Sequence, residues 1–600
     1  MYNVSEIYKT QIKQTLRNPS YIKVEFSIVD PQAIGDASLS DNVAETHYSD
    51  LSRTTGIYDV AKTYMTLEHN RFFLDGQNPL APELDATEML YQGFVGATIS
   101  GDDRTWSDSP KITINFLTTY FEFIGLTFSF DTVRNEFPEQ FRIVAYKDAL
   151  EVYNVLVTPD RADMYVHEDN IPECNKIEII PTKSTTPHRR FRFQNIIFGV
   201  IKIFDNDVVS TSKLTQELDL INSKLPKNNF DFTIIDVNRE YDPENPLGIY
   251  QYMESQQPIN FKYGYELNDG SIEWIQGGNT FTTGEIDVKS EAVIPMVSFK
   301  TTSTLAYLID VYKEGIYTGS PVSLYDLAME VLEFANIPLN AQGQVRWKLD
   351  DALKSIYTTS PLPVGEVRVL LQLIANAGMC VLYVDRDGNI VIEPKDITPT
   401  GFTFELSDVY TIPSTSKYPI LNGVDTYAST LTVRATAEEL GSFDIVGASD
   451  TLYEFDYSSM ATDVVATAGS GLTIVGTPTY YANMCRVVLT GTGKLTINGK
   501  IIDVGKNVVS VEFNSTGDRC PIENSLITSR SHAVAYATWI GNYVNRRNEY
   551  EFEDRGFPEL DCGDELALNT LFNDGVNGTL ISAEISFNGT LKGKSKILKQ

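Results

Sequence analysis

Short runs of alternating apolar and polar residues dominate this chain and limit its fold more than any other feature. Side chains in a strand point to opposite faces of a sheet in turn, so this period predicts strands with one buried face. Turn-rich segments separate the runs, which is typical of a β-sandwich or jelly roll. Between residues 90 and 204 the runs are KITINF, IGLTFSFD, FRIVAY, EVYNVLV, NKIEIIP and FRFQNIIFGVIKIFD.

Further strand-like runs fill 230–310 and return after residue 400. We expect hairpin turns at Asp75-Gly76, Asn268-Asp269-Gly270 and Asn498-Gly499, because these pairs readily adopt positive φ. Residues 465–515, around the last of these turns, are predicted to form a small inserted β unit.

Three segments have the apolar spacing of amphipathic helices. They are SLYDLAMEVLEFAN at 323–336, a segment at 364–377 that contains VRVLLQLIANA, and SHAVAYATWIGNYVNRR at 531–547. Ser323 and Asp326 are placed to cap the first helix. Gly378 stands where a left-handed helix C-terminal cap is expected.

Composition limits the classes of function. A chain of 600 residues predicts several domains, and 48 Lys and Arg against 80 Asp and Glu give a net charge of −32. Such a surface repels nucleic acid and anionic membranes, so no specific nucleic-acid binding is expected. No apolar run approaches the ~20 residues of a membrane-spanning helix. The five cysteines form no CxxC pair, which argues against a disulfide framework or a zinc site.

The segment DRDG at 385–388 could be a calcium loop or a tight turn. Counted from Asp385, a calcium loop needs glycine at position six and a bidentate Glu at position twelve, but Ile390 and Asp396 stand there. Two alternating apolar runs flank the segment, so a hairpin turn is predicted. Because HExxH, P-loop and GxSxG patterns are absent too, we expect no cofactor, no metal and no enzymatic activity.

The turn GDDRTWSDSP at 101–110 is the candidate ligand site. Sugar sites often combine an aromatic platform with carboxylate and guanidinium groups, since a sugar has an apolar face and a polar edge. The candidate glycan-binding residues are Asp102, Asp103, Arg104 and Trp106. The alternative is an ordinary polar loop with Trp106 inside the sandwich.

Several motifs, taken in order, resemble the tail hub or tail-tip family of phages that infect Gram-positive bacteria. YMTLEHNRFFLDG at 64–76 is similar to an entry motif of such tail proteins, and the module after it resembles an inserted discoidin or galactose-binding-like domain. SLYDLAMEVLEFANI and VRVLLQLIANAGMCVLYVDRDGNIVIEP resemble the helical section of the hubs. RGFPELDCGDELALN and GTLISAEISFNGTLKG are similar to their closing barrel strands.

The resemblance implies a mainly β, multidomain fold. It has two hub-type β-barrel domains, an inserted β-sandwich or jelly roll, and a small α+β helical domain. The implied boundaries are 1–85 and 206–315 for barrel domain I, 90–204 for the galactose-binding-like insertion, 320–398 for the α+β helical domain, 400–455 and 530–600 for barrel domain II, and 456–525 for a small β insertion.

The resemblance also implies a role. Hubs of this family are homotrimers that present six similar units to a sixfold tail tube, contact distal-tail and fibre or spike proteins, and let DNA pass. The expected location is the virion tail, at the tip or baseplate, after synthesis in the bacterial cytoplasm. Many such hubs continue into a wall-degrading domain; here that activity is expected on another chain. Two alternatives stay open: a carbohydrate-binding receptor-recognition protein that binds cell-wall carbohydrate, and a tail-associated cell-wall hydrolase.

Overall fold

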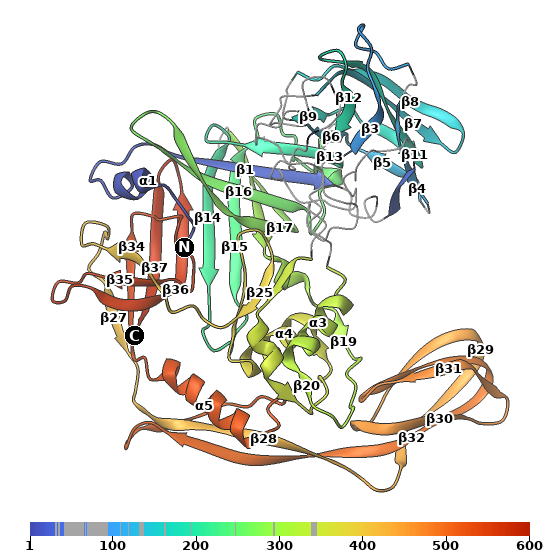
Figure 1. Ribbon diagram of the computed structural model, residues 1–600, viewed down its shortest axis with the longest axis vertical. Helices are drawn as coiled ribbons and strands as arrows, with labels where there is room; N and C mark the ends of the chain where they lie inside the picture. Colours follow the sequence, from blue (N-terminus) through green and yellow to red (C-terminus); the bar gives the residue numbers. More distant parts are fainter. Residues whose placement is uncertain are drawn as a thin grey trace.

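The computed structural model describes residues 1–29, 33, 36–40, 65, 68, 72, 94–107, 110–117, 119–130, 137–160, 164–193, 195–245, 248–291, 294–337 and 345–600. The fold is mainly β, as predicted, with several sheets and few helices (Figure 1). Most of the 64–76 motif and the Asp75-Gly76 turn lie outside the described residues.

A fifteen-stranded sheet runs through the centre of the molecule and combines strands from both ends of the chain. Its N-terminal part follows the order β14-β15-β18-β17-β16-β1-β13 and is antiparallel throughout. These strands are β1 (Ser20–Val29), β13 (Asn195–Phe204), β14 (Val209–Glu217), β15 (Lys227–Ile235), β16 (Pro258–Glu266), β17 (Ile272–Glu291) and β18 (Ile294–Thr302). The predicted turn at 268–270 joins β16 to β17, where Leu267 N donates to Ser271 O at 2.7 Å.

The C-terminal part of the same sheet has the order β27-β34-β37-β36, with β35 pairing β36 and β26. Its strands are β26 (Pro399–Phe404), β27 (Ser414–Lys417), β34 (Asn548–Asp554), β35 (Glu565–Leu568), β36 (Val576–Phe587) and β37 (Leu591–Lys599). The short helix α1 (Glu6–Gln11) packs here. Its Tyr8 and the nearby Ile12 share a core with Phe404, Phe552 and Leu580.

One pairing joins the two parts. β14 and β36 run antiparallel from Ser212 opposite Phe587 to Glu217 opposite Ser582. At its centre Leu214 faces Ile585, and both are buried in the core of the N-terminal part. Segments that are far apart in sequence therefore form one continuous sheet (Figure 1).

A β module projects from one end of this sheet. β13 serves both bodies, because residues 195–198 pair with β6 of the module and residues 199–204 pair with β1. β6 and its neighbour β9 are thereby the last two of the fifteen strands. The core of the module is rich in Phe and Ile. Its strands are β2 (Ala37–Ser40), β3 (Phe94–Ile99), β4 (Ile112–Phe116), β5 (Phe121–Phe123), β6 (Leu126–Ser129), β7 (Pro138–Lys147), β8 (Leu150–Val157), β9 (Met164–His167), β10 (Ile171–Cys174), β11 (Lys176–Ser184) and β12 (Arg190–Phe193).

The helical unit contains two of the predicted helices. The Ser323 side chain caps α3 by accepting from Asp326 N at 3.1 Å. Helix α4 stops before Gly378 as predicted, but the left-handed conformation is not at this glycine: Gly378 has a φ of −73°, and Met379 has a φ of 57°. DRDG is a hairpin turn, in which Asp385 N donates to Asn389 O at 2.9 Å and Gly388 has a φ of 83°. The elements are β19 (Val311–Tyr312), β20 (Val322–Ser323), α3 (Leu324–Phe334), β21 (Trp347–Leu349), β22 (Tyr357–Thr358), β23 (Gly365–Glu366), α4 (Val367–Ala377), β24 (Val381–Val384) and β25 (Ile390–Glu393). Single 3-10 turns occur at Tyr250–Tyr252, Thr304–Tyr307 and Asp351–Ser355.

A long β arm lies below these bodies and carries a small lobe at its far end (Figure 1). The third predicted helix, α5, packs along the arm. The elements are β28 (Leu421–Val433), β29 (Glu438–Asp456), β30 (Ala461–Ala468), β31 (Leu472–Tyr480), β32 (Met484–Glu512), β33 (Asp518–Pro521) and α5 (Arg530–Val544). Both β28 and β29 pair with β32, not with the C-terminal strands of the main sheet.

The predicted hairpin turn at Asn498-Gly499 is wrong. Both residues lie inside the 29-residue strand β32, where Asn498 faces Glu439 on β29 and Val465 on β30. A Cβ on Gly499 would lie 2.8 Å from Leu440 Cδ1 and 3.0 Å from Val464 Cγ2. This glycine therefore permits close packing in a strand and does not form a turn.

Truncating the joint between the two parts of the main sheet is expected to destabilise the protein. Leu214→Ala and Ile585→Ala should each lower the free energy of unfolding by about 2–4 kcal/mol, because each leaves a cavity in a closed core. The double variant should cost less than the sum, since the two positions face each other. Denaturant unfolding measures this. Thr211→Ala, on the exposed face of β14, is the control, and equal losses for all three variants would contradict the prediction.

Candidate functional site

The four residues predicted to bind glycan lie together on the turn between β3 and β4. Gly101 N donates to Thr105 O at 2.9 Å, and Arg104 has a φ of 69°. Trp106 is only 7% exposed, and its Nε1 donates to Arg189 O at 3.1 Å. The indole packs edge-on against Phe191 with ring centroids 5.9 Å apart, so it presents no open face here.

The charged members of this turn contact protein groups. Thr105 donates to both oxygens of Asp103, at 3.1 and 2.7 Å, and these hydrogen bonds hold the pKa of Asp103 below its ordinary value. Asp102 lies 3.0 Å from the His188 Nε2. Arg104 forms an ion pair with Glu139.

The cavity beside Trp106 measures about 20 Å³, which is room for about one water molecule and not for a sugar ring. Phe137, Phe191 and Arg190 help to line it. Glycan binding at Asp102, Asp103, Arg104 and Trp106 therefore stays a prediction, and the packing of Trp106 matches the alternative of a polar loop.

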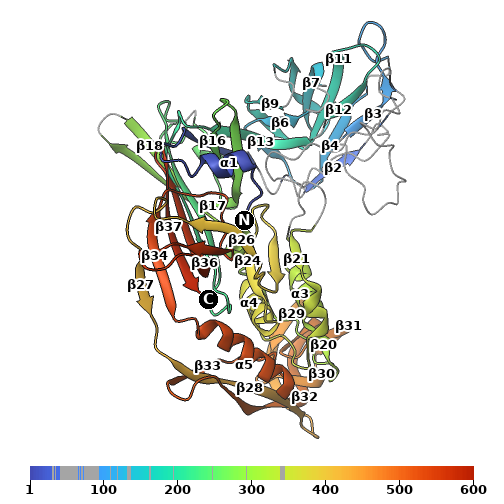
Figure 2. The same cartoon turned by 60° about the vertical axis from the view of Figure 1, so that its left-hand side comes forward.

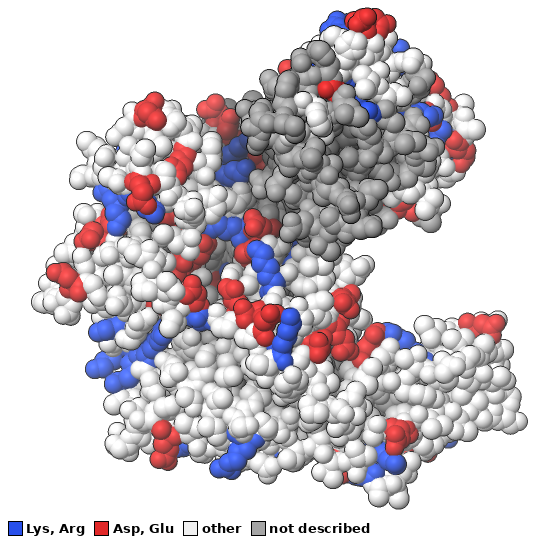
Figure 3. All heavy atoms as spheres, in the orientation of Figure 1, with Lys and Arg blue, Asp and Glu red and all other residues white. Residues whose placement is uncertain are grey.

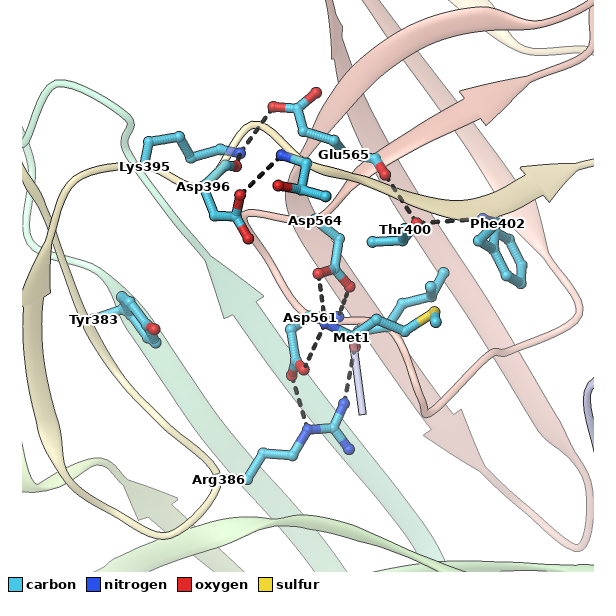
Figure 4. A network of polar contacts seen from close by, with 12 residues as sticks. Met1, Tyr383, Arg386, Lys395, Asp396, Thr400, Phe402, Asp561, Asp564 and Glu565 are labelled. Carbon is cyan, nitrogen blue, oxygen red and sulfur yellow. Dashed lines mark hydrogen bonds and ion pairs between the residues drawn. The ribbon is translucent and has the colours of Figure 1, made fainter. Parts of the chain in front are cut away.

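A larger cavity of about 500 Å³ lies where four parts of the chain meet. Its walls come from residues 1–3, the adjoining ends of β14 and β15, the β24–β25 hairpin and the loop 561–564. Figure 4 shows the polar contacts on its wall. None of these contacts was anticipated from the sequence.

Arg386, the second residue of the DRDG turn, ties the helical unit to both parts of the main sheet. Its Nε donates to Asp561 Oδ1 at 2.8 Å, and its Nη2 donates to the carbonyls of Pro558 and Leu560 at 2.8 and 3.1 Å. Its Nη1 donates to the carbonyl of Gln276 on β17 at 2.5 Å. The segment considered as a calcium loop thus supplies an arginine that holds three bodies together.

Lys395 and Glu565 form a buried ion pair at the same junction. Lys395 Nζ lies 2.8 Å from Glu565 Oε1, and their side chains are 4% and 3% exposed. Thr579 Oγ1 and Gln600 Nε2 also donate to this carboxylate, each at 2.6 Å. A charge pair removed from water needs such additional hydrogen bonds to offset its desolvation.

The N-terminal segment and the loop after β34 each supply an arginine that binds backbone carbonyls of the other segment. Arg17 Nη1 donates to the carbonyls of Arg555 and Gly556, the latter at 3.0 Å. In return, Arg555 Nη2 donates to the carbonyls of Gln14 and Thr15 at 2.7 and 3.2 Å. Each segment thereby holds the other in place.

A buried carboxyl group lies beside this exchange. Tyr8 OH donates to Glu559 Oε2 at 2.9 Å, and burial raises the pKa of Glu559 from its ordinary value of 4.5 to about 7. Burial disfavours the charged carboxylate, while the hydrogen bond from Tyr8 opposes the shift.

Together these contacts fix the positions of the helical unit and the two parts of the main sheet relative to one another. In the part of the chain that the structure describes, no group of three or more His, Cys, Asp or Glu side chains is placed to hold a metal ion. Within the same residues, no helix combines the length and the apolar character needed to cross a bilayer.

Breaking the buried ion pair should be costly. Lys395→Met or Glu565→Gln alone is expected to lower the free energy of unfolding by about 3–5 kcal/mol, because one partner is left uncompensated. The double variant should recover part of this loss. Lys500→Met, which breaks the exposed pair with Asp463, serves as the control and should cost at most ~1 kcal/mol. Equal effects at both pairs would contradict the argument.

Glu559 should make stability depend on pH. Its folded pKa lies above the unfolded value, so its contribution is complete below about pH 4.5 and is lost as the pH rises through about 7. Over that window this group should remove about 3 kcal/mol from the free energy of unfolding. Glu559→Gln should abolish that component, whereas Glu553→Gln, on the exposed side of β34, should retain it. Parallel pH curves for all three proteins would refute the assignment.

Comparison with known proteins gives only distant matches. No family model matches the chain, and no curated protein matches it significantly. Solved structures that resemble it include a tail protein from Neisseria meningitidis MC58 (10% identity, 66% of this chain and 94% of that chain, TM-score 0.38) and the 43 kDa tail protein of prophage MuSo2 from Shewanella oneidensis (10%, 66% and 95%, TM-score 0.36). A prophage tail protein from Listeria monocytogenes EGD-e is 6% identical, with 66% and 90% covered and a TM-score of 0.32. TM-scores of this size do not establish a shared fold.

Proposed function

We propose that this chain is a structural hub protein of a phage tail or a phage-derived particle, which forms a homotrimeric ring at the tail tip or baseplate. The observation that carries the proposal is the β14–β36 pairing, which joins two β bodies edge to edge in one sheet. Three such subunits would offer six β bodies around a ring, the number that a sixfold tail tube requires. The hub-like sequence motifs occur in the same order along the chain.

A ring component must keep its two β bodies at a fixed angle, and the contacts across the joint suit this need. Lys213 on β14 lies 3.0 Å from Glu584 on β36, so an ion pair crosses the joint on the outer face of the sheet. The core around Tyr8 and the bonds of Arg386 add buried contacts between the bodies.

The remaining bodies extend away from the main sheet and supply surfaces for other tail components. Figures 1 and 2 show the 94–204 module at one end of the molecule and the β arm at the other. We assign to these bodies the contacts with tube, distal-tail and fibre or spike proteins. In this assignment the galactose-binding-like module acts as a packing domain.

The negative net charge of the chain supports the proposal that DNA passes through the ring. A net charge of −32 gives phosphate groups little to bind, so an acidic channel would let DNA slide without adhering. A solved ring whose channel is lined mainly by Lys and Arg would overturn this part of the proposal.

Electron microscopy of the purified chain, together with its mass in solution, tests the ring. We expect a threefold ring with an open channel and a mass three times that of the 67.1 kDa chain. Leu214→Asp, which places a charge in the joint core, is the matched variant and should abolish the ring. A monomer at every concentration, or a ring of another symmetry, would contradict the trimer. Cell-wall lysis that is lost on substituting one carboxylate would favour the hydrolase alternative instead.

A further inference from the structure

The main sheet ends in an exposed strip of residues, and within the described part of the chain no strand pairs with its outer side. Among the described strands, β27 is the terminal strand of the sheet and pairs with β34 alone. Every residue from 410 to 420 is exposed except Pro413. Four large apolar side chains stand within these eleven residues: Tyr410 (56% exposed), Ile412 (70%), Tyr418 (47%) and Ile420 (39%). Single exposed apolar residues are ordinary, but such a group on one strip indicates a contact surface.

Helix α5 extends this strip. Arg547, just after the helix, donates from Nε to the carbonyl of Tyr418 at 2.8 Å, so the two segments touch. The exposed face of α5 lacks the acidic residues common on surface helices. It consists of Arg530, Ser531, Val534, Ala535, Thr538 and Asn542. We call this face together with residues 410–420 the edge surface.

The edge surface is cationic in a strongly acidic chain. Residues 409–424 and 524–548 contain no Asp or Glu, although the whole chain has 80. They carry Lys417, Arg530, Arg546 and Arg547. Figure 3 shows Lys and Arg side chains gathered where β27 approaches the C-terminal end of α5. Glu549 on the adjacent strand β34 accepts a hydrogen bond from Tyr418 OH at 3.0 Å and pairs with Lys596, and the rest of the acidic excess lies mainly on other parts of the molecule.

The backbone of this edge is poorly suited to accept another strand. Tyr418 N donates to Arg547 O, so alternate residues at 413, 415, 417 and 419 direct their backbone groups away from β34. Two of them, Pro413 and Pro419, have no N–H to donate. A short edge strand that is flanked by proline and carries a lysine is protected against strand addition. A partner must therefore bind through side chains.

We propose that the edge surface binds the acidic surface of a second copy of this chain. Charge complementarity identifies the partner: the cations and the apolar strip lie on one face, and the acidic excess of an identical chain lies on others. A contact between unlike faces of identical subunits is heterologous and closes into a ring when the rotation permits. The inference rests on the proposed ring and specifies which surface closes it.

The double variant Ile412→Asp/Lys417→Glu tests the inference in the full-length chain. Both side chains are exposed, so the fold should persist, which circular dichroism and the thermal midpoint check. Sedimentation across a concentration series should show the ring dissociating at concentrations on the order of 100-fold higher than for the wild-type protein, because a central apolar contact is lost and a charge is reversed. The matched control is Val446→Asp/Lys494→Glu on the exposed surface of the lobe, which should leave the ring intact.

The outcomes separate this inference from the proposed function. Rings that form equally in wild type and both variants overturn the edge surface and leave the hub proposal standing. An intact ring that loses association with purified tails identifies a different tail protein as the occupant, and this result also overturns the inference. A wild-type chain that remains monomeric at every concentration refutes both the ring and its closure through this surface.

Discussion

The antiparallel pairing of β14 with β36 is the interaction on which the rest of this structure depends. It makes one sheet from strands near the beginning and the end of the chain, and it buries Leu214 against Ile585 at the joint. The intervening sequence can then be divided among bodies that need not share a core. The helical unit, the arm and the lobe accordingly have hydrophobic clusters of their own.

Charged groups also hold the two parts of the main sheet together. Apolar burial is non-directional, so by itself it would not define one angle between the two parts. Arg386 reaches three carbonyls on two bodies, and Lys395 with Glu565 forms a pair almost excluded from water. Such groups are expensive to bury unless their geometry is satisfied, so they favour one arrangement over its neighbours. Fixed relative orientation is what a subunit needs if identical copies are to close a ring without strain.

The sequence predicted structural features that depend on residues close together in the chain. It missed contacts between residues that are far apart in the chain. Alternating runs, the cap at Ser323 and the turn at DRDG are local patterns, and the structure confirms them. The Asn498-Gly499 pair gave a wrong turn prediction, because glycine also occurs inside strands at positions where neighbouring side chains pack closely. Arg386 and Glu559 gave no signal, since their partners lie between about 110 and 550 residues away. For Trp106 the sequence left two readings open, an aromatic platform for a sugar or a side chain inside the sandwich, and the indole lies buried against Phe191.

The distance along the chain between β14 and β36 also sets an order in time. β36 is synthesised about 370 residues after β14, which takes on the order of tens of seconds on a ribosome. Until then the edge of β14 has no partner, and the N-terminal segment lacks the loop around residues 555–560 that holds it. The main sheet is therefore completed only after β36 has been synthesised. Before that point nothing fixes the angle between the two parts of the sheet, so the orientation that the proposed ring requires arises late in synthesis.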